Sequence, residues 1–419
     1  MAGPGDGFRG WLGRGGFRLP AVKAGRIILL LLLPGLAQGY PLDDEIMGIR
    51  RLPGFRPGSS YSVEALLMPP GALRGRESIV LHLTEEQARS GELGRRDEAL
   101  SGVLKRVLGA NGDCSAVLLD YTRGRERQWA GVAEEQPGAP ASVGKLLVVL
   151  SLFHELARVR PEVAKRVELL RGRLVAGGEW LRGDDHTIPL YQAAEDRVIW
   201  RQAEETERFS LMEWLDHLFT ASSNAAANVV WKEALLMRRF GEAYPPDEAS
   251  EAAFFRQSGL WEEVRRGLSE AMAAAELSSE AFRVGNFWTR RARERVPGGG
   301  GSTATARELA RFLLRLEQGR LVDEWSSLEM KRLLYFTGRR HRFAAGESLA
   351  GSALYYKGGS LPGPRETVMN AVSLVESPAR SGSGQRRYLV TLLCRLPTGE
   401  AESTLQRLGD ALGREMAWP

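Results

Sequence analysis

Residues 143–156 constrain the fold more than any other stretch of this 419-residue sequence. They read as a helix in which apolar side chains cover most of the circumference, namely Leu146, Leu147, Val148, Val149, Leu150, Leu152 and Phe153. A helix that is apolar nearly all round needs other elements on every side, so this one belongs in the middle of a domain. With 43% hydrophobic and 26% charged residues, the chain has the composition of a globular protein, which can bury such a helix in its core.

Segments typical of strands precede this helix and return near the other end of the chain. They are residues 115–121, 128–132, 352–356, 367–375 and 387–393. Helical segments at 97–108 and 402–416 flank them, and residues 160–335 between them are mainly helical by periodicity. This order predicts an α+β fold, in which a five-stranded antiparallel sheet from both chain ends has flanking helices and an inserted all-helical subdomain.

The first 39 residues have the three parts of a secretory signal: basic residues up to Arg26, the apolar run 27–33 and small residues through Gly39. We expect cleavage near Gly39 and a periplasmic or secreted protein. The apolar run is far shorter than the ~20 residues that a membrane-spanning helix needs. Residues 40–95, rich in Pro, Gly and Arg, follow as an N-terminal extension of unassigned role, and the main domain is expected at residues 96–419.

Composition argues against several classes of function. The first 39 residues hold five basic side chains and one acidic one, so they account for most of the net charge of +5, and a nucleic-acid partner has little support. Cys114 and Cys394 are the only cysteines, too few for a disulfide-rich scaffold or a four-cysteine metal site. The five histidines show no metal-ligand spacing. We therefore expect neither a metal nor a cofactor.

Ser142 and Lys145 stand three residues apart at the start of the apolar helix, so their side chains share one face. The helix N-terminus favours negative charge at Ser142, and burial lowers the pKa of a lysine until it can accept a proton. For the pair alone, an N-cap serine followed by a lysine that reaches the surface is equally compatible. The chain holds only seven lysines against 50 arginines, so arginine is its usual source of positive charge. A lysine at position 145 therefore favours a role in which the side chain loses its proton, which a guanidinium group cannot do.

Two further groups carry possible chemistry. Ser222-Ser223-Asn224 follows an amphipathic helix; its hydroxyl can relay a proton and its amide can hold a carbonyl, although such residues are also common helix caps. Lys357-Gly358-Gly359-Ser360 ends an apolar strand. There a lysine supplies a point charge for a carboxylate and two glycines permit close approach, although a strand that ends in a glycine turn has the same sequence.

In order, the three groups have the spacing S-x-x-K, S-x-N and K-x-G, which resembles the serine β-lactamases and penicillin-binding proteins. The resemblance to class A β-lactamases covers roughly residues 97–419 and extends to segments 219–228, 302–312 and 337–346. It implies an acyl-enzyme at Ser142, proton transfer by Lys145 and Ser222, and an amide contact from Asn224. It further implies that Lys357 anchors a substrate carboxylate, with the backbone N–H groups of Ser142 and Ser360 as the oxyanion hole beside Gly359.

Three departures from the family pattern bear on turnover. Ser223 replaces a structural aspartate, and Gly358 replaces a hydroxyl residue that helps to bind the carboxylate. Counting back from residues 297–298 places the deacylating glutamate at Thr289, and the nearest acids, Glu280 and Glu294, are out of register. We therefore expect acylation to outrun deacylation, since a general base is typically worth ~10² to 10⁴-fold in rate.

The sequence thus predicts an exported, penicillin-recognising serine acyl-hydrolase that acts on a β-lactam or a peptidoglycan-related peptide. The alternatives are a cell-wall ligand binder or scaffold that has lost turnover, and a D,D-peptidase. A phosphate loop at residues 138–145 is disfavoured, because its glycine spacing is one residue too long and Leu146 replaces Ser or Thr. The fold resemblance also brings Cys114 and Cys394 together, as a disulfide or as two buried thiols.

Overall fold

The computed structural model describes residues 47–52, 76–85, 93–109, 113–122, 126–344, 346–349, 351–378 and 384–417. All of them belong to one compact unit, Gly39–Pro419. The predicted signal segment lies outside the described residues, as does most of the 40–95 extension. Among the described residues, none of the helices combines the length and the apolar character that a membrane crossing requires.

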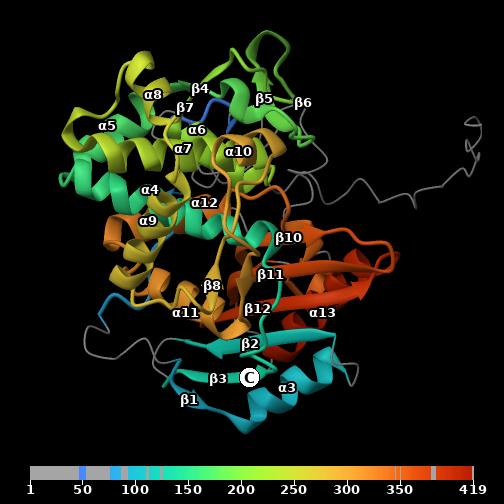
Figure 1. Cartoon of the computed structure of the whole chain (residues 1–419). Helices are drawn as coiled ribbons and strands as arrows, with labels where there is room; N and C mark the ends of the chain where they lie inside the picture. The colour runs from blue at the N-terminus through green and yellow to red at the C-terminus, as the bar shows by residue number, and fades with distance from the viewer. Residues whose placement is uncertain are drawn as a thin grey trace, which may run out of the picture. The chain divides into compact units, whose positions relative to one another are not determined.

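The central sheet combines strands from both ends of the sequence, as predicted (Figure 1). Its order is β1-β3-β2-β12-β11-β10, with bounds β1 Arg95–Arg96, β2 Cys114–Asp120, β3 Gln128–Val132, β10 Ala353–Leu361, β11 Glu366–Pro378 and β12 Gln385–Pro397. The five long strands pair antiparallel, which confirms the predicted fold class. The two-residue β1 adds a parallel sixth strand beside β3; its exposed arginines carry no strand pattern that the sequence could reveal.

Both faces of the sheet are covered. Along β2, Ala116 and Leu118 belong to one apolar cluster, whereas Val117 and Leu119 belong to the other, as the period of two in a strand requires. Helices α3 (Glu98–Leu108) and α13 (Ala401–Met416) cover the first face. On the other face, α11 (Ala306–Glu317) and α12 (Glu324–Tyr335) contact the strands of the sheet. The remaining helices contribute to the same apolar cluster: α4 Lys145–Val159, α5 Val163–Gly172, α6 Leu211–Thr220, α7 Asn224–Phe240, α8 Glu248–Phe254, α9 Leu260–Ala274 and α10 Arg290–Arg295.

Helix α4 occupies the position that its composition predicts. Twelve of its fifteen residues are buried, and it packs against α7 and α9. Cys114 and Cys394 are paired opposite each other on β2 and β12, with Cα atoms 4.1 Å apart, and they form a disulfide. The predicted proximity of the two cysteines is therefore confirmed, and the disulfide is the alternative that the structure contains.

The inserted region is mainly helical, but it is not all-helical as predicted. It contains two small antiparallel ribbons, one of β4 (Leu174–Ala176) with β7 (Arg208–Ser210) and one of β5 (Ile188–Gln192) with β6 (Arg197–Arg201). A third ribbon joins β8 (Phe282–Arg283) to β9 (Thr303–Ala304). These strands have two to five residues and irregular burial, so no alternation of apolar and polar residues marks them in the sequence.

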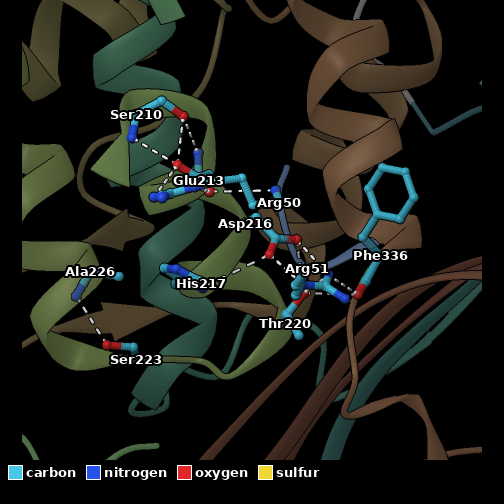
Figure 2. Close-up of polar contacts among 10 residues, drawn as sticks. All are labelled: Arg50, Arg51, Ser210, Glu213, Asp216, His217, Thr220, Ser223, Ala226 and Phe336. Carbon is cyan, nitrogen blue, oxygen red and sulfur yellow. Dashed lines mark hydrogen bonds and ion pairs between the residues drawn. The ribbon is translucent and has the colours of Figure 1, made fainter. Parts of the chain in front are cut away.

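The described part of the N-terminal extension is built into the core. In residues 47–52, three apolar side chains (Met47, Ile49 and Leu52) are 1% exposed. The buried Arg51 guanidinium donates to both oxygens of Asp216, at 2.5 and 2.6 Å, and to Thr220 Oγ1 at 2.6 Å (Figure 2). Because Thr220 is the last residue of α6, this segment holds the helix end that leads directly to Ser222.

Candidate active site

Ser142 lies in a 3-10 turn, Ala141–Gly144, that leads into the buried helix α4. Strand β10 crosses directly over this turn, because a Cβ atom on Gly359 would come within 2.9 Å of the backbone nitrogens of Ser142 and Val143. A glycine at 359 is therefore required by the packing of the strand on the serine turn. The side chain of Ser142 caps neither helix, which leaves its hydroxyl available for chemistry.

Lys145 is 0% exposed, which rules out the surface-reaching lysine of the simpler interpretation. Its Nζ donates to Ser142 Oγ at 3.2 Å, to Asn224 Oδ1 at 2.8 Å and to the backbone oxygen of Ser222. Burial lowers the pKa of Lys145 to about 7, against the opposing attraction of Asp184. Near neutral pH a large fraction of this lysine is uncharged, and an uncharged amine beside a hydroxyl is able to accept its proton.

Ser222 connects the two lysines of the site. Its backbone oxygen accepts from Lys145, and its Oγ accepts from Lys357 Nζ at 2.8 Å. Lys357 is 1% exposed, and burial, together with the charge of Lys145, holds its pKa well below the usual range. Ser222 has φ of 58°, a left-handed conformation that costs a non-glycine residue free energy, so the surrounding contacts must hold it in place.

The predicted site residues converge on one cavity of about 460 Å³. Ser142, Ser222, Asn224, Gly359 and Ser360 all line it. The buried Lys145 and Lys357 donate hydrogen bonds to the hydroxyls of Ser142 and Ser222, respectively. Strand β10 is the outer strand of the sheet in the described part of the chain, and its residues Gly359 and Ser360 line the cavity. The roles assigned to these residues stay predictions, but the geometry brings all seven together.

The charge of the cavity wall is one-sided. Three arginines, Arg293, Arg339 and Arg342, belong to the lining, and none of the described lining residues is an aspartate or glutamate. Such a wall favours an anionic ligand. The sequence analysis did not find Arg339 and Arg342, which lie next to Lys357 and contribute to its lowered pKa.

The interpretation of Thr289 as the residue at the deacylating position is wrong. Thr289 is 1% exposed, caps α10 through Ala292 N and accepts from Asn228 Nδ2 at 2.8 Å; it does not line the cavity. The preceding residue, Trp288, lines the cavity, and its ring centre lies 5.7 Å from Lys145 Nζ. Counting back along a loop assumes a fixed loop length and does not show which side chain reaches the cavity; here Trp288 does and Thr289 does not.

Neither of the two nearby acids compensates. Glu294 forms ion pairs with Arg290 and Arg291 at 3.2 Å on α10, and Glu280 is exposed. Neither lines the cavity. A tryptophan therefore stands beside Lys145 where the resemblance led us to expect a position for a carboxylate.

The loop before β5 contributes two groups that the sequence analysis missed. His186 lines the cavity, and its ring Nδ1 lies 2.6 Å from Asp184 Oδ1. Asp184, Asp185 and His186 are the one set of possible metal ligands in the described parts of the chain, with donor atoms within 4.8 Å of one another. Because both Asp184 oxygens already accept hydrogen bonds from protein groups, we assign no metal to this set.

Comparison with known proteins supports the fold and the family. The family described as "Beta-lactamase enzyme family" matches residues 98–416, a span that includes all three motifs. The comparison with curated proteins finds no match.

A comparison with solved structures gives the following similarities. The TLA-3 extended-spectrum β-lactamase has a TM-score of 0.50 at 9% identity, over 77% of this chain and 98% of that one. PBP-A has a TM-score of 0.49 at 14% identity, over 77% and 97%. The β-lactamase from Sphaerobacter thermophilus has a TM-score of 0.48 at 13% identity, over 75% and 95%. At 9% identity, the similarity to the TLA-3 structure concerns the fold alone, whereas the family match covers more than half of the sequence. On that match, the chain belongs to the beta-lactamase enzyme family.

Proposed function

We propose that the protein is an exported, penicillin-recognising serine acyl-hydrolase that forms an acyl-enzyme at Ser142. One observation carries this proposal: the Nζ atom of the fully buried Lys145 lies 3.2 Å from Ser142 Oγ, at the floor of a cavity that residues of all three motifs line. A serine next to a base of matched pKa is an activated nucleophile.

The acylation step follows from these contacts. Uncharged Lys145 takes the Ser142 proton while Oγ forms a bond to the substrate carbonyl carbon. The amide carbon–nitrogen bond then breaks, and Ser222 Oγ, 2.8 Å from Lys357 Nζ, passes a proton to the leaving nitrogen. Ser222 Oγ regains a proton from charged Lys357 Nζ, which donates to it. The proton taken from Ser142 stays on Lys145, and the proton delivered to the leaving nitrogen is replaced from Lys357, so charge and protons balance.

The cationic wall supports an anionic substrate. Lys357 anchors the carboxylate of a β-lactam or of a peptidoglycan-related peptide, although its charged form is disfavoured by burial until that anion arrives. Gly358 offers no hydroxyl to this carboxylate. Arg339 and Arg342, which line the same cavity, supply charge in its place.

Deacylation is the slow step in this proposal. A hydrolytic water needs a general base, and the described lining residues contain no carboxylate while Trp288 stands beside Lys145. The same observation favours a D,D-peptidase as the second candidate, because such enzymes use the three motifs without that glutamate. A binding or scaffold domain without turnover would show neither acylation nor hydrolysis.

Export is supported by the Cys114–Cys394 disulfide, because such bonds form and persist in oxidising compartments. The predicted signal segment in the first 39 residues supports the same location.

Intact-mass measurement after exposure to benzylpenicillin tests the acyl-enzyme. We expect a stoichiometric adduct on the unmodified protein, none on Ser142→Ala, and a rate about 10² to 10⁴-fold lower in Lys145→Arg, which keeps the charge but cannot accept a proton. Ser302→Ala is the matched control, because Ser302 lines the same cavity outside the motifs. An adduct that persists in Ser142→Ala would rule out the proposed nucleophile.

A further inference from the structure

Asp184 is a nearly buried carboxylate that none of the three motifs contains. It lies in the loop before β5, and only 4% of its side chain is exposed. Its Oδ2 accepts from Ser223 Oγ at 2.9 Å and from the backbone nitrogen of Ala225 at 2.7 Å. Its Oδ1 accepts from the His186 ring at 2.6 Å. Burial alone would raise the pKa of Asp184, but these hydrogen bonds outweigh it and hold the pKa below its usual value, so the group is an anion at neutral pH.

The contacts with Ser223 and Ala225 lie at the N-terminus of α7. Ser223 is the N-cap residue of this helix, and its Oγ accepts from Ala226 N at 3.0 Å (Figure 2). Asp184 binds the same hydroxyl and the neighbouring free N–H, at the end of the helix where negative charge is favoured. One carboxylate thus fixes the turn whose side chains include Ser222 and Asn224.

This turn needs such support. Ser222 has φ of 58°, and its neighbour Asn224 must direct Oδ1 toward Lys145 at 2.8 Å. The Asp184 anion also acts on Lys145 directly, since its attraction opposes the effect of burial on the lysine pKa. Lys357 of β10 is a second charged group that interacts with Lys145. The hydrogen-bond and ring partners of Lys145 are neutral, namely Ser142, Ser222, Asn224 and Trp288.

We propose that Asp184 is a positioning residue of this active site, which supplies from a different loop the carboxylate that Ser223 lacks and holds Ser222 and Asn224 against Lys145. The same carboxylate holds His186 at the cavity wall. This inference rests on the proposed function, because its main consequence is the rate of acylation at Ser142.

Removing the charge of Asp184, or moving it to position 223, tests the inference. Asp184→Asn should slow acylation by benzylpenicillin about ten- to a hundredfold, the loss expected when a buried charge-assisted contact is removed. Asp185→Asn is the matched control: Asp185 also lies near His186, at 3.3 Å, but its side chain is 96% exposed and has no contact with Ser223 or Ala225. It should change the rate less than about twofold. The double variant Asp184→Ser/Ser223→Asp should recover most of the lost rate.

The pH profile separates positioning from general damage. Because the Asp184 anion favours charged Lys145, Asp184→Asn should move the acid limb of the acylation profile to lower pH. A merely structural defect would lower the rate at every pH without moving the limb. An unshifted limb, an unchanged rate in Asp184→Asn, or a double variant as slow as the single one would each overturn the inference.

The failure of the proposed function gives a different result. If the unmodified protein forms no adduct, the proposed function fails. The thermal unfolding midpoints of the single and double variants then test whether Asp184 holds the turn at Ser223. Loss in Asp184→Ser and in Ser223→Asp, with recovery in Asp184→Ser/Ser223→Asp, supports a carboxylate that either position can supply. Strictly additive losses contradict it. The same cycle applies if Asp184→Asn folds poorly.

Discussion

The two walls of the cavity are built in different ways. On the sheet side, Lys357, Gly359 and Ser360 belong to one strand, and the backbone pairing of β10 with β11 places them. On the helical side, the positions of Ser222 and Trp288 depend on buried side chains from distant parts of the chain. Because backbone pairing does not depend on side-chain identity, side-chain substitutions should leave the position of the sheet wall unchanged. The helical wall depends on a few polar side-chain contacts, and a single substitution can remove one of them.

The largest expected effect comes from the contact that holds the end of α6. Arg51→Met leaves the fully buried Asp216 without its guanidinium and should destabilise the fold by about 3–5 kcal/mol, measured by urea denaturation. Arg50 is the matched control, since it pairs with Glu213 but 65% of its side chain is exposed. Arg50→Met should cost at most about 1 kcal/mol. Equal losses in the two variants would remove the distinction between the buried and the exposed contact.

A smaller effect is expected where Trp288 lies beside Lys145. Trp288→Glu places a carboxylate at the cavity wall beside Lys145 and should speed decay of the acyl-enzyme, by about 10²-fold if the new group acts as a general base. Thr289→Glu should not do so, because Thr289 is buried and bonded to Asn228. Time-resolved intact mass of the preformed adduct measures both rates. Faster decay in the Thr289 variant alone would restore the register that the structure rejects.

The smallest expected effect concerns Lys145, where the two walls meet. Its pKa of about 7 means that the uncharged form predominates above that pH and is lost as the pH falls. The acylation rate should therefore drop by about tenfold from pH 8 to pH 6, through titration of this one group. Stopped-flow measurements with a chromogenic cephalosporin across this range check the midpoint. A midpoint near 10 would show a lysine of ordinary pKa and hence a different base.

Several features of the fold and the site could be predicted from local sequence. The apolar helix and the five long strands have a hydrophobic periodicity that is visible in the sequence alone. The three motifs have a residue spacing that is visible in the same way. The short ribbons of the inserted region and β1 could not be predicted, because strands of two to five residues carry too little pattern. The sequence also could not show that Trp288 rather than Thr289 lines the cavity, because a loop has no periodicity that indicates which side chain points inward.

The sequence by itself determined the chemical groups of the active site and their order along the chain, because each motif is local and each residue type has limited chemistry. Tertiary structure alone decided which groups support them. Asp184 reaches Ala225 across 41 residues, and Arg51 reaches Asp216 across 165. Such pairs leave no local signal, because a buried charge is stable only beside a partner that folding brings to it. Only folding, too, could show that Trp288 lies beside Lys145 whereas Thr289 is bonded to Asn228.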